Sequence, residues 1–531
     1  MLTPSKPSGY GSSDSTFYPL VILGAGMGGI GMACQLKDRL GFDQFRIFER
    51  QSGIGGTWWI NRYPGIACDI PAIFYSFSFY QNPNWTSFFP CGEEILRYQQ
   101  SVVEKYQLID KIQLNSDVTL CQWDDVNNEW TITVRNLIPG IGDLSAAERQ
   151  KLAAVEGPES VYVSTEKVRC KVLVSAVGGL VEPRGWPSNV TGQEAFSGEV
   201  FHSARWNDDA DLSGKNILVV GTGCTAAQLV PKLLTEKGAK RVTQVMREAP
   251  WVVPRIIPPL GEEGWSKHAP KLFNTIPGSM NLVRKLVAAQ IDATFTYFGA
   301  SKFSQQAREK LRQELLDHLY KTAPKKYHQI LTPNYDVGCK RRIFDTDWYP
   351  SLADPRIELT TLALKSVNSN SAILAPSQKT HPSETHKGEK EIPCDVIILA
   401  NGFEVSNWFH PLEVVGLNGE SLNSVFGKRG GPQMYKGTAL DGFPNFAVLF
   451  GPNSFSGHSS VILGLENQIG HAIQLISPLL QNDAFKIDLK REAALSYNQE
   501  TQAALKTMVW NSGGCTSWYL SGDGHNSVNY P

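Results

Sequence analysis

Short apolar runs that lead directly into glycines occur twice along the chain, about 200 residues apart. Residues 18–23 (YPLVIL) precede the cluster at 24–29 (GAGMGG), and residues 215–220 (KNILVV) precede the cluster at 221–226 (GTGCTA). Such runs are typical of buried parallel strands, and apolar positions after each cluster repeat at helical spacing. Each unit is therefore expected to begin a doubly wound α/β sheet of its own.

The pattern outside these units divides the chain further. Residues 129–134 alternate like a strand, 136–160 resemble a surface excursion, and 171–178 form another apolar run that ends in small residues. Turn-forming residues near 185–195 indicate a crossing between domains. Leucines at 311, 315, 316 and 319 make one apolar stripe, so a helical insertion is expected at about 255–335.

Two later stretches complete this picture. Residues 366–391 are polar and rich in Pro, Ser and Lys, so a solvated loop is expected there. Residues 395–402 (DVIILANG) predict a strand and a tight turn, which we interpret as the return of the chain to the first domain.

Composition excludes several classes of protein. The chain has 531 residues and a formal net charge of −1, so its overall charge favours neither nucleic acid nor an anionic membrane surface as a partner. The longest apolar runs are interrupted well before 18 residues, so no membrane span is expected. The first 16 residues are rich in Ser, Gly and Pro, which is typical of a disordered lead-in and not of a signal peptide.

Nine cysteines are spread along the chain without a C-x-x-C pair. This spacing argues against a dithiol redox centre, and no metal site is expected. Sparse cysteines favour a reducing compartment, so a cytoplasmic location is expected. The sequence does not specify the oligomeric state, and a monomer is compatible with it.

The first glycine cluster has the context of a dinucleotide-binding turn. Gly24 permits the turn, Gly26 allows backbone N–H groups to approach a pyrophosphate, and Gly29 allows the helix to pack closely on the strand. The next apolar run, 45–48, is followed by Glu49, 25 positions after Gly24. A carboxylate there accepts hydrogen bonds from a ribose 2′-OH and repels a 2′-phosphate, which predicts FAD or NAD.

The second cluster predicts a different dinucleotide. Gly221, Thr222, Gly223, Thr225 and Ala226 form the expected turn, and the strand that follows ends at Arg247. A cation at that position suits the 2′-phosphate of NADPH, although Glu248 weakens the local positive potential and Lys340 is a candidate second cation. The alternative is an ordinary surface arginine.

A chain that binds FAD in one domain and NADPH in another takes hydride from the nicotinamide onto the flavin. Without a C-x-x-C pair, reduction of a disulfide is a poor candidate, which leaves reduction of O₂. The expected boundaries are 1–16 for the lead-in, 17–190 for the first segment of the FAD-binding domain, 191–392 for the NADPH-binding domain with its insertion, and 393–531 for the second segment with a closing C-terminal segment.

Several motifs resemble those of one family in order and spacing. Residues 196–206 (FSGEVFHSARW) match F-x-G-x-x-x-H-x-x-x-W, the fingerprint of Baeyer–Villiger monooxygenases, although Asn207 departs from the usual Pro or Asp. Residues 55–65 (GGTWWINRYPG), 338–341 (GCKR), 399–403 (LANGF) and 517–519 (SWY) match other segments of the family. The resemblance runs from about residue 17 to the end.

The resemblance implies a reaction and site residues. It implies that NADPH reduces FAD, that O₂ adds to the flavin, and that an anionic C4a-peroxyflavin inserts one oxygen atom beside a ketone carbonyl to give an ester or lactone. The implied catalytic pair is Arg341, whose guanidinium keeps its charge, and Asp69, which orients it. Further residues implied to contact the cofactors are Gly56, Thr57, Trp58, Asp69, Tyr75, Val118, Gln228, Lys340 and Trp518.

Two other functions stay open at this point. One is an N- or S-hydroxylating flavin-containing monooxygenase, and the other is a nucleotide-binding regulatory flavoprotein without turnover. Arg342 stands beside Arg341, so the register of the pair is open as well. His202 is a weak candidate for a catalytic base, and His458 is expected in a loop near the substrate pocket.

Overall fold

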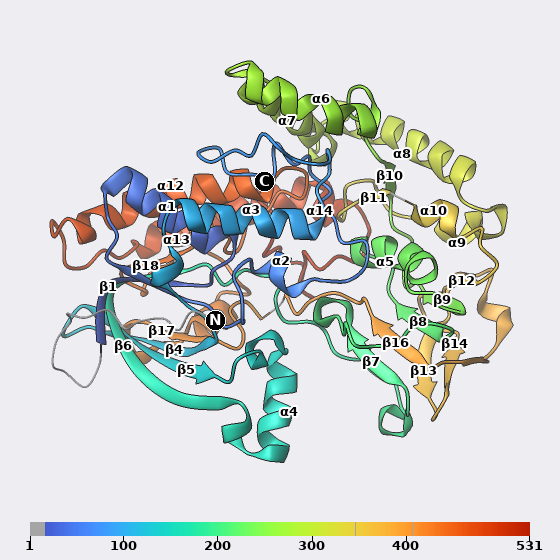
Figure 1. The fold of residues 1–531 in the computed structure, drawn as a ribbon, viewed down its shortest axis with the longest axis horizontal. Coiled ribbons are helices and arrows are strands. Elements are labelled where there is room, and N and C mark those ends of the chain that lie inside the picture. The colour runs from blue at the N-terminus through green and yellow to red at the C-terminus, as the bar shows by residue number, and fades with distance from the viewer. Residues whose placement is uncertain (1–15, 346, 406) are drawn as a thin grey trace.

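The computed structural model describes residues 16–345, 347–405 and 407–531, so nearly all of the expected lead-in lies outside the described residues. Two separate sheets organise the molecule, one on each side in Figure 1. The first begins with the strand before the first glycine cluster and the second contains the strand before the second cluster. The mixed α/β fold with two Rossmann-like units is the one expected from the sequence.

The first sheet has the strand order β17-β4-β5-β6-β1-β2-β3, with β18 paired to β6. Its central strands run parallel, whereas β4, β5 and β6 form an antiparallel meander. Its strands are β1 (Thr16–Leu23), β2 (Phe45–Phe48), β3 (Ile112–Gln113), β4 (Ser116–Asp124), β5 (Glu129–Leu137), β6 (Tyr162–Ser175), β17 (Glu413–Val415) and β18 (Phe446–Val448).

Helices cover one face of this sheet, and the meander covers the other. Helix α1 follows the first glycine cluster because its apolar positions, including Ile30 and Leu36, are completely buried against the sheet. The helices of this unit are α1 (Met27–Leu40), α2 (Thr57–Ile60), α3 (Gly92–Lys105), α4 (Ala146–Glu156), α11 (Leu422–Lys428), α12 (Val461–Leu480), α13 (Arg491–Thr507) and α14 (Val509–Ser512).

The second sheet is parallel throughout, in the order β12-β9-β8-β16-β7. Its strands read as nearly continuous apolar runs because both faces are buried. Its elements are β7 (Glu199–His202), β8 (Asn216–Val220), α5 (Cys224–Thr235), β9 (Arg241–Val245), α10 (Trp348–Ser351), β12 (Ile357–Thr360) and β16 (Val396–Leu399).

A helical insertion follows β9, as the sequence predicts. Leu311, Leu315 and Leu319 of the expected stripe are buried. Its elements are β10 (Val252–Pro254), α6 (Gly261–Thr275), α7 (Ser279–Ala293), α8 (Lys302–Thr322), α9 (His328–Leu331) and β11 (Ile343–Asp345), which pairs with β10. In Figure 1, α6 and α7 lie at the edge of the molecule. In the described residues, no helix combines the length and apolar character that a membrane crossing requires.

The expected solvated loop at 366–391 is wrong. This stretch contributes to a three-stranded antiparallel sheet of β13 (Ala363–Val367), β14 (Ser371–Ala375) and β15 (Lys390–Pro393). Leu374 is completely buried, and the buried carboxylate of Glu384 accepts from Thr361 N and Oγ1. Strand β14 is buried at Ser371, Ala372, Leu374 and Ala375, so apolar positions inside a polar stretch pack as a strand despite the Pro and Ser content.

The return of the chain to the first unit comes later than expected. Strand β16 pairs with β7 and β8 in the second sheet, so the boundary at 393 falls inside that sheet and the crossing spans 400–412. The earlier crossing spans 176–198. The two crossings are bonded to each other, because Arg184 N donates to Gly402 O at 2.9 Å and Glu404 N donates to Glu182 O at 2.9 Å.

Candidate active site

The first glycine cluster leaves no room for side chains where the chain turns. Gly24 has φ +99°, and a Cβ there would lie 2.7 Å from Ala176 O. A Cβ on Gly29 would lie 1.9 Å from Gly24 O, so this glycine is required for close helix–strand packing. A Cβ on Gly26 would meet only the backbone of Gly56, with Cα at 3.4 Å and N at 3.8 Å, which leaves room for an approaching group.

Glu49 lies at this turn and is buried. One carboxylate oxygen accepts from Ala25 N at 2.6 Å and the other accepts from Gln51 N at 2.9 Å. Burial raises the pKa of Glu49, and the two backbone N–H groups oppose that shift. Strand β4 begins beside it, since Ser116 N donates to Glu49 O, and this strand carries Val118 two residues further on.

A second short turn faces the first. Gly56 stands before α2 with φ +55°, and its backbone lies against Gly26. Thr57 is exposed at the start of α2, whereas Trp58 is buried and donates from Nε1 to Tyr75 Oη at 3.2 Å. The two glycine turns therefore form one cradle, which fits the pyrophosphate of a dinucleotide because exposed N–H groups and a helix start meet there.

The second glycine cluster repeats the arrangement in the second unit. Gly221 has φ +127°, and a Cβ there would lie 2.3 Å from Ala400 O. Gly223 stands before α5 and faces open space, so a phosphate has room at the start of this helix. Thr222 and Thr225 are half-buried, and Ala226 packs in the core.

Near this turn, one cation is exposed and a second is paired with a carboxylate. Arg247 is exposed just after β9, whose last residue accepts a bond from Gly221 N. Glu248 is paired with Lys340, whose ammonium also lies 4.5 Å from the ring centroid of Tyr335. Burial lowers the pKa of Lys340. Glu248 is thus neutralised within the protein, which leaves Arg247 as the cation that suits a 2′-phosphate.

Arg341 and Asp69 form an ion pair across the two units. Asp69 comes from the segment after α2, and Arg341 comes from the segment between α9 and β11. The Asp69 charge is the largest influence on the pKa of Arg341 and raises it. Arg342 instead lies 5.7 Å from the ring centroid of Tyr297, and its pKa is lowered by burial. The pairing therefore selects Arg341 over its neighbour.

Gln228 is engaged at the junction of the units. Its Oε1 accepts from Tyr63 Oη at 2.8 Å, and its Nε2 donates to Ala67 O at 3.0 Å. The Tyr63 hydroxyl also bonds with Thr225. The amide expected to contact a nucleotide thus connects α5 to the segment that carries Asp69.

The C-terminal segment packs on the segment that carries Arg341. Cys339 and Cys515 form a disulfide, and Asp336 N donates to Gly513 O at 2.9 Å. The buried Tyr519 bonds with the backbone of Arg341. Trp518 is partly exposed beside it. This disulfide departs from the expectation of reduced thiols, and two cysteines 176 residues apart carried no signal for it.

Neither of the two highlighted histidines has the position of a catalytic base. His202 ends β7, and its Nδ1 accepts from Ala204 N at 3.0 Å. Burial lowers the pKa of His202 to about 4, so the ring is neutral at physiological pH. His458 lies between the rings of Phe295 and Phe298 of the insertion, and burial lowers its pKa as well.

Asp143 makes contacts beside the first cradle that the sequence did not reveal. It lies in the expected surface excursion, yet Oδ1 accepts from Ser52 N and Trp59 Nε1, both at 3.0 Å, and Oδ2 accepts from Ser52 Oγ at 2.6 Å. A Cβ on its neighbour Gly142 would lie 1.8 Å from Arg50 O. This excursion therefore packs directly on the chain between Glu49 and Gly56.

Two protein-family models match the chain. The model of the NAD(P)-binding Rossmann-like domain matches residues 22–90, around the first cradle. The model of flavin-binding monooxygenase-like proteins matches residues 162–290, which include the second glycine cluster.

Relatives extend the likeness over nearly the whole length. A Baeyer-Villiger monooxygenase of Streptomyces coelicolor is 31% identical over 96% of this chain and 88% of its own. One of Pseudomonas aeruginosa is 32% identical over 94% and 85%. The structure of cyclohexanone monooxygenase from Rhodococcus sp. Phi1 bound to NADP⁺ matches with a TM-score of 0.74 at 22% identity, over 97% of this chain and 94% of that one. This structural likeness establishes the fold.

Proposed function

Because the chain belongs to the Baeyer–Villiger monooxygenases, we propose that Arg341, oriented by Asp69, supplies the positive charge at which its oxygen insertion takes place. The protein is a flavoprotein monooxygenase that uses FAD, NADPH and O₂. A ketone, O₂, NADPH and a proton give an ester or lactone, NADP⁺ and water. The Arg341–Asp69 pair is the observation that carries the proposed residue roles, since it joins the two nucleotide-binding units at one charged point.

The first cradle is proposed to hold FAD. Gly24, Gly26, Gly29 and Gly56 leave backbone room for the pyrophosphate, and Glu49 is positioned to accept from a ribose hydroxyl. The remaining residues proposed to line this site are Thr57, Trp58, Asp69, Tyr75 and Val118. FAD held by these residues would supply the redox chemistry, which is acceptance of hydride from NADPH and activation of O₂ for the insertion.

The second cradle is proposed to hold NADPH. Gly223 at the start of α5 supports a pyrophosphate site, and exposed Arg247 supports preference for a 2′-phosphate. The other residues proposed here are Gly221, Thr222, Thr225, Ala226, Lys340 and Trp518, with Gln228 acting from the junction. The proposed domain plan keeps the boundary between 190 and 191, and moves the one expected at 393 past β16, so that this strand belongs to the second unit.

The proposed role of Arg341 is electrostatic. A guanidinium keeps its proton under working conditions. The charge of Asp69 raises the pKa of Arg341 further, so this side chain stays positively charged. A unit charge at about 4 Å contributes on the order of 4 kcal/mol at an effective dielectric near 20. That energy favours negative charge on the oxygen atoms that react at the carbonyl, including the ketone oxygen when it becomes an oxyanion.

Replacement of the guanidinium tests this role. Arg341→Ala should lower the rate of ester formation at least about 100-fold, the cost of removing one strong electrostatic contact. The measurement is product mass gain of one oxygen with cyclic, linear, aryl and steroid ketones, next to NADPH consumption and flavin absorbance. Arg341→Ala should keep its bound flavin and its NADPH-dependent flavin reduction.

The neighbouring arginine supplies the matched control. Arg342→Ala should retain ester formation within a few-fold, because its partner is an aromatic ring of the insertion. Equal loss in both variants, or loss in Arg342→Ala alone, contradicts the assignment. Loss of ester formation with retained sulfide oxidation in Arg341→Ala supports the assignment, whereas indifference of both activities to this change would indicate an N- or S-hydroxylating function.

We also propose that the enzyme works in the cytoplasm. Seven of the nine cysteines are free thiols, and five of those seven are buried, which supports a reducing compartment. Cell fractionation with a fluorescent fusion checks this location.

A further inference from the structure

The hairpin of α6 and α7 carries an unpartnered apolar face. Leu272 on α6 and Ile276 directly after it are 40% and 53% exposed, and Leu282 and Leu286 on α7 are each 61% exposed. These four side chains, here called the outer face, lie on adjoining turns of the hairpin. Large apolar side chains clustered this way usually mark an interaction surface.

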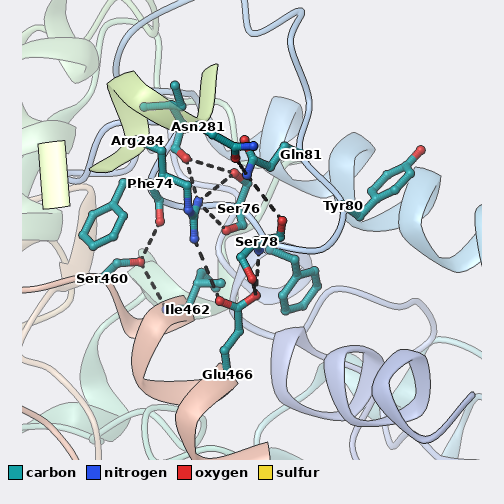
Figure 2. A network of polar contacts seen from close by, with 12 residues as sticks. Phe74, Ser76, Ser78, Tyr80, Gln81, Asn281, Arg284, Ser460, Ile462 and Glu466 are labelled. Atoms are coloured by element: carbon teal, nitrogen blue, oxygen red, sulfur yellow. Dashed lines mark hydrogen bonds and ion pairs between the residues drawn. The ribbon is translucent and has the colours of Figure 1, made fainter. Parts of the chain in front are cut away.

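The inner face of α7 is firmly attached to the first unit (Figure 2). Arg284 Nη1 donates to Ile73 O at 2.7 Å and to Ser76 O at 2.9 Å, and its Nη2 lies 3.9 Å from Glu466 of α12. Glu466 in turn accepts from Ser78 N at 2.6 Å. Val287, Ala288 and Ile291 of α7 pack against the core of that unit.

Helix α6 is attached in the same way. The indole of Trp265 meets the ring of Phe88 edge-on at 5.0 Å, and Asn274 Nδ2 donates to Asn84 Oδ1 at 2.8 Å. Since the inner face of each helix already has partners, the hairpin cannot turn its outer face inward without breaking them. The outer face is therefore available to something outside the chain.

The local charge differs from that of the whole chain. Residues 264–291 contain no Asp or Glu, and Lys267, Lys271 and Lys285 are exposed. The net charge of −1 for the whole chain hides this basic stretch. The acidic residues of the hairpin, Glu262, Glu263 and Asp292, lie at the far ends of the two helices, away from the loop beside the outer face. Leucines and isoleucines bordered by lysines are the composition of amphipathic helices that lie on anionic membranes.

A second copy of the chain suits this surface less well. A two-fold contact places the same patch on both partners, so Lys271 and Lys285 of one copy would face those of the other. Like charges at such a contact oppose association. We propose that the outer face of the α6–α7 hairpin docks the enzyme on an anionic lipid surface, with the leucines in the interface and the lysines at the headgroups.

Vesicle binding by the FAD-loaded full chain tests this proposal. Co-sedimentation with phosphatidylcholine vesicles containing about a third phosphatidylserine should exceed that with pure phosphatidylcholine by at least about five-fold, and should fall as salt rises. L282E/L286E should reduce binding to anionic vesicles at least about ten-fold, and K271E/K285E should remove the preference for anionic lipid. All variants should keep flavin and turnover of a water-soluble ketone.

The matched control replaces two exposed apolar residues outside the hairpin by glutamate. Val155 of α4 and Leu495 of α13 are 76% and 42% exposed, so V155E/L495E alters charge and apolar area without touching the hairpin and should bind vesicles like the parent. Absence of binding by the parent protein overturns the proposal, as does equal binding by L282E/L286E. A concentration-dependent dimer that L282E/L286E abolishes, without vesicle binding, assigns the face to a second copy instead.

Discussion

A single carboxylate, Asp143, connects an excursion of the chain to the first nucleotide cradle. It accepts from Ser52, which lies between Glu49 and the second glycine turn, and from Trp59 of α2 just after that turn. Hydrogen bonds to a charged acceptor contribute about 1.5–3 kcal/mol each when they are shielded from water. Asp143 therefore fixes the backbone that the proposed FAD site depends on.

Asp143→Ala should weaken FAD binding about ten-fold, equivalent to about 1.4 kcal/mol, because the 50–56 segment must then be ordered by the cofactor itself. Titration of the apoprotein with FAD, followed by flavin fluorescence, measures the change. Asp208→Ala, at an exposed position in a loop of the second unit, is the control and should bind FAD like the parent. If Asp143→Ala binds FAD with the affinity of the parent, Asp143 does not order the FAD site and only packs the excursion against it.

Residue-level prediction succeeded where sterics or motif spacing dictate a position. The glycines at 24, 29 and 221 were recognisable because no other residue fits those turns, and the structure excludes a Cβ at each. Asp69 and Arg341 were identified by resemblance, and the structure pairs them. Asp143 escaped notice because its partners lie 84 and 91 positions away, and no local pattern reports such a contact.

Strand β7 ends in a histidine that couples the stability of the second sheet to pH. His202 is buried beside β16 and has a pKa of about 4, below the value near 6.5 of an exposed histidine. The unfolded chain therefore binds more protons than the folded chain between pH 4 and 6.5, so stability falls as pH drops through that window. For this one group the loss is about 2 kcal/mol between pH 7 and pH 5.

His202→Gln should consequently show a smaller drop in melting temperature between pH 7 and pH 5 than the parent, by a few degrees. Thermal unfolding of the holoenzyme, followed by release of flavin fluorescence, makes the comparison. His268→Gln, at an exposed position of α6, should follow the parent curve. A parallel drop in His202→Gln would mean that this ring does not contribute to the acid response.

The prediction of strands and loops failed where a stretch is polar in composition but has buried residues. The stretch 366–391 is polar overall, yet β14 buries Ala372 and Leu374, and tertiary pairing decides its structure. Strand β16 was recognised as a strand but assigned to the wrong sheet. Buried parallel strands have nearly the same apolar character, so the sequence does not indicate which neighbours such a strand joins.

Across the whole molecule, the Cys339–Cys515 disulfide closes a loop with a sequence separation of 176 residues. A cross-link over so long a loop restricts the unfolded chain, and the expected stabilisation is about 3–5 kcal/mol. It also ties the C-terminal segment with Trp518 to the segment with Lys340 and Arg341.

Cys515→Ser should lower the melting temperature by several degrees and raise the KM for NADPH a few-fold, while FAD retention stays unchanged. Thermal unfolding with and without a phosphine reductant, together with NADPH kinetics, measures both effects. Cys91→Ser removes an exposed free thiol and serves as the control. If the reductant leaves the melting temperature of the parent unchanged, the cross-link does not stabilise the fold.

The paired crossings at 176–198 and 400–412 limit how the two nucleotide-binding units can move. Because Arg184 and Glu404 bond each crossing to the other, the two crossings of the chain form one narrow two-stranded ribbon. Such a ribbon bends and twists far more readily than it stretches. The units also meet through Gln228, through the Arg341–Asp69 pair and through the insertion, so a swing about 182–184 and 402–404 has to break or shift those contacts while the ribbon keeps its length.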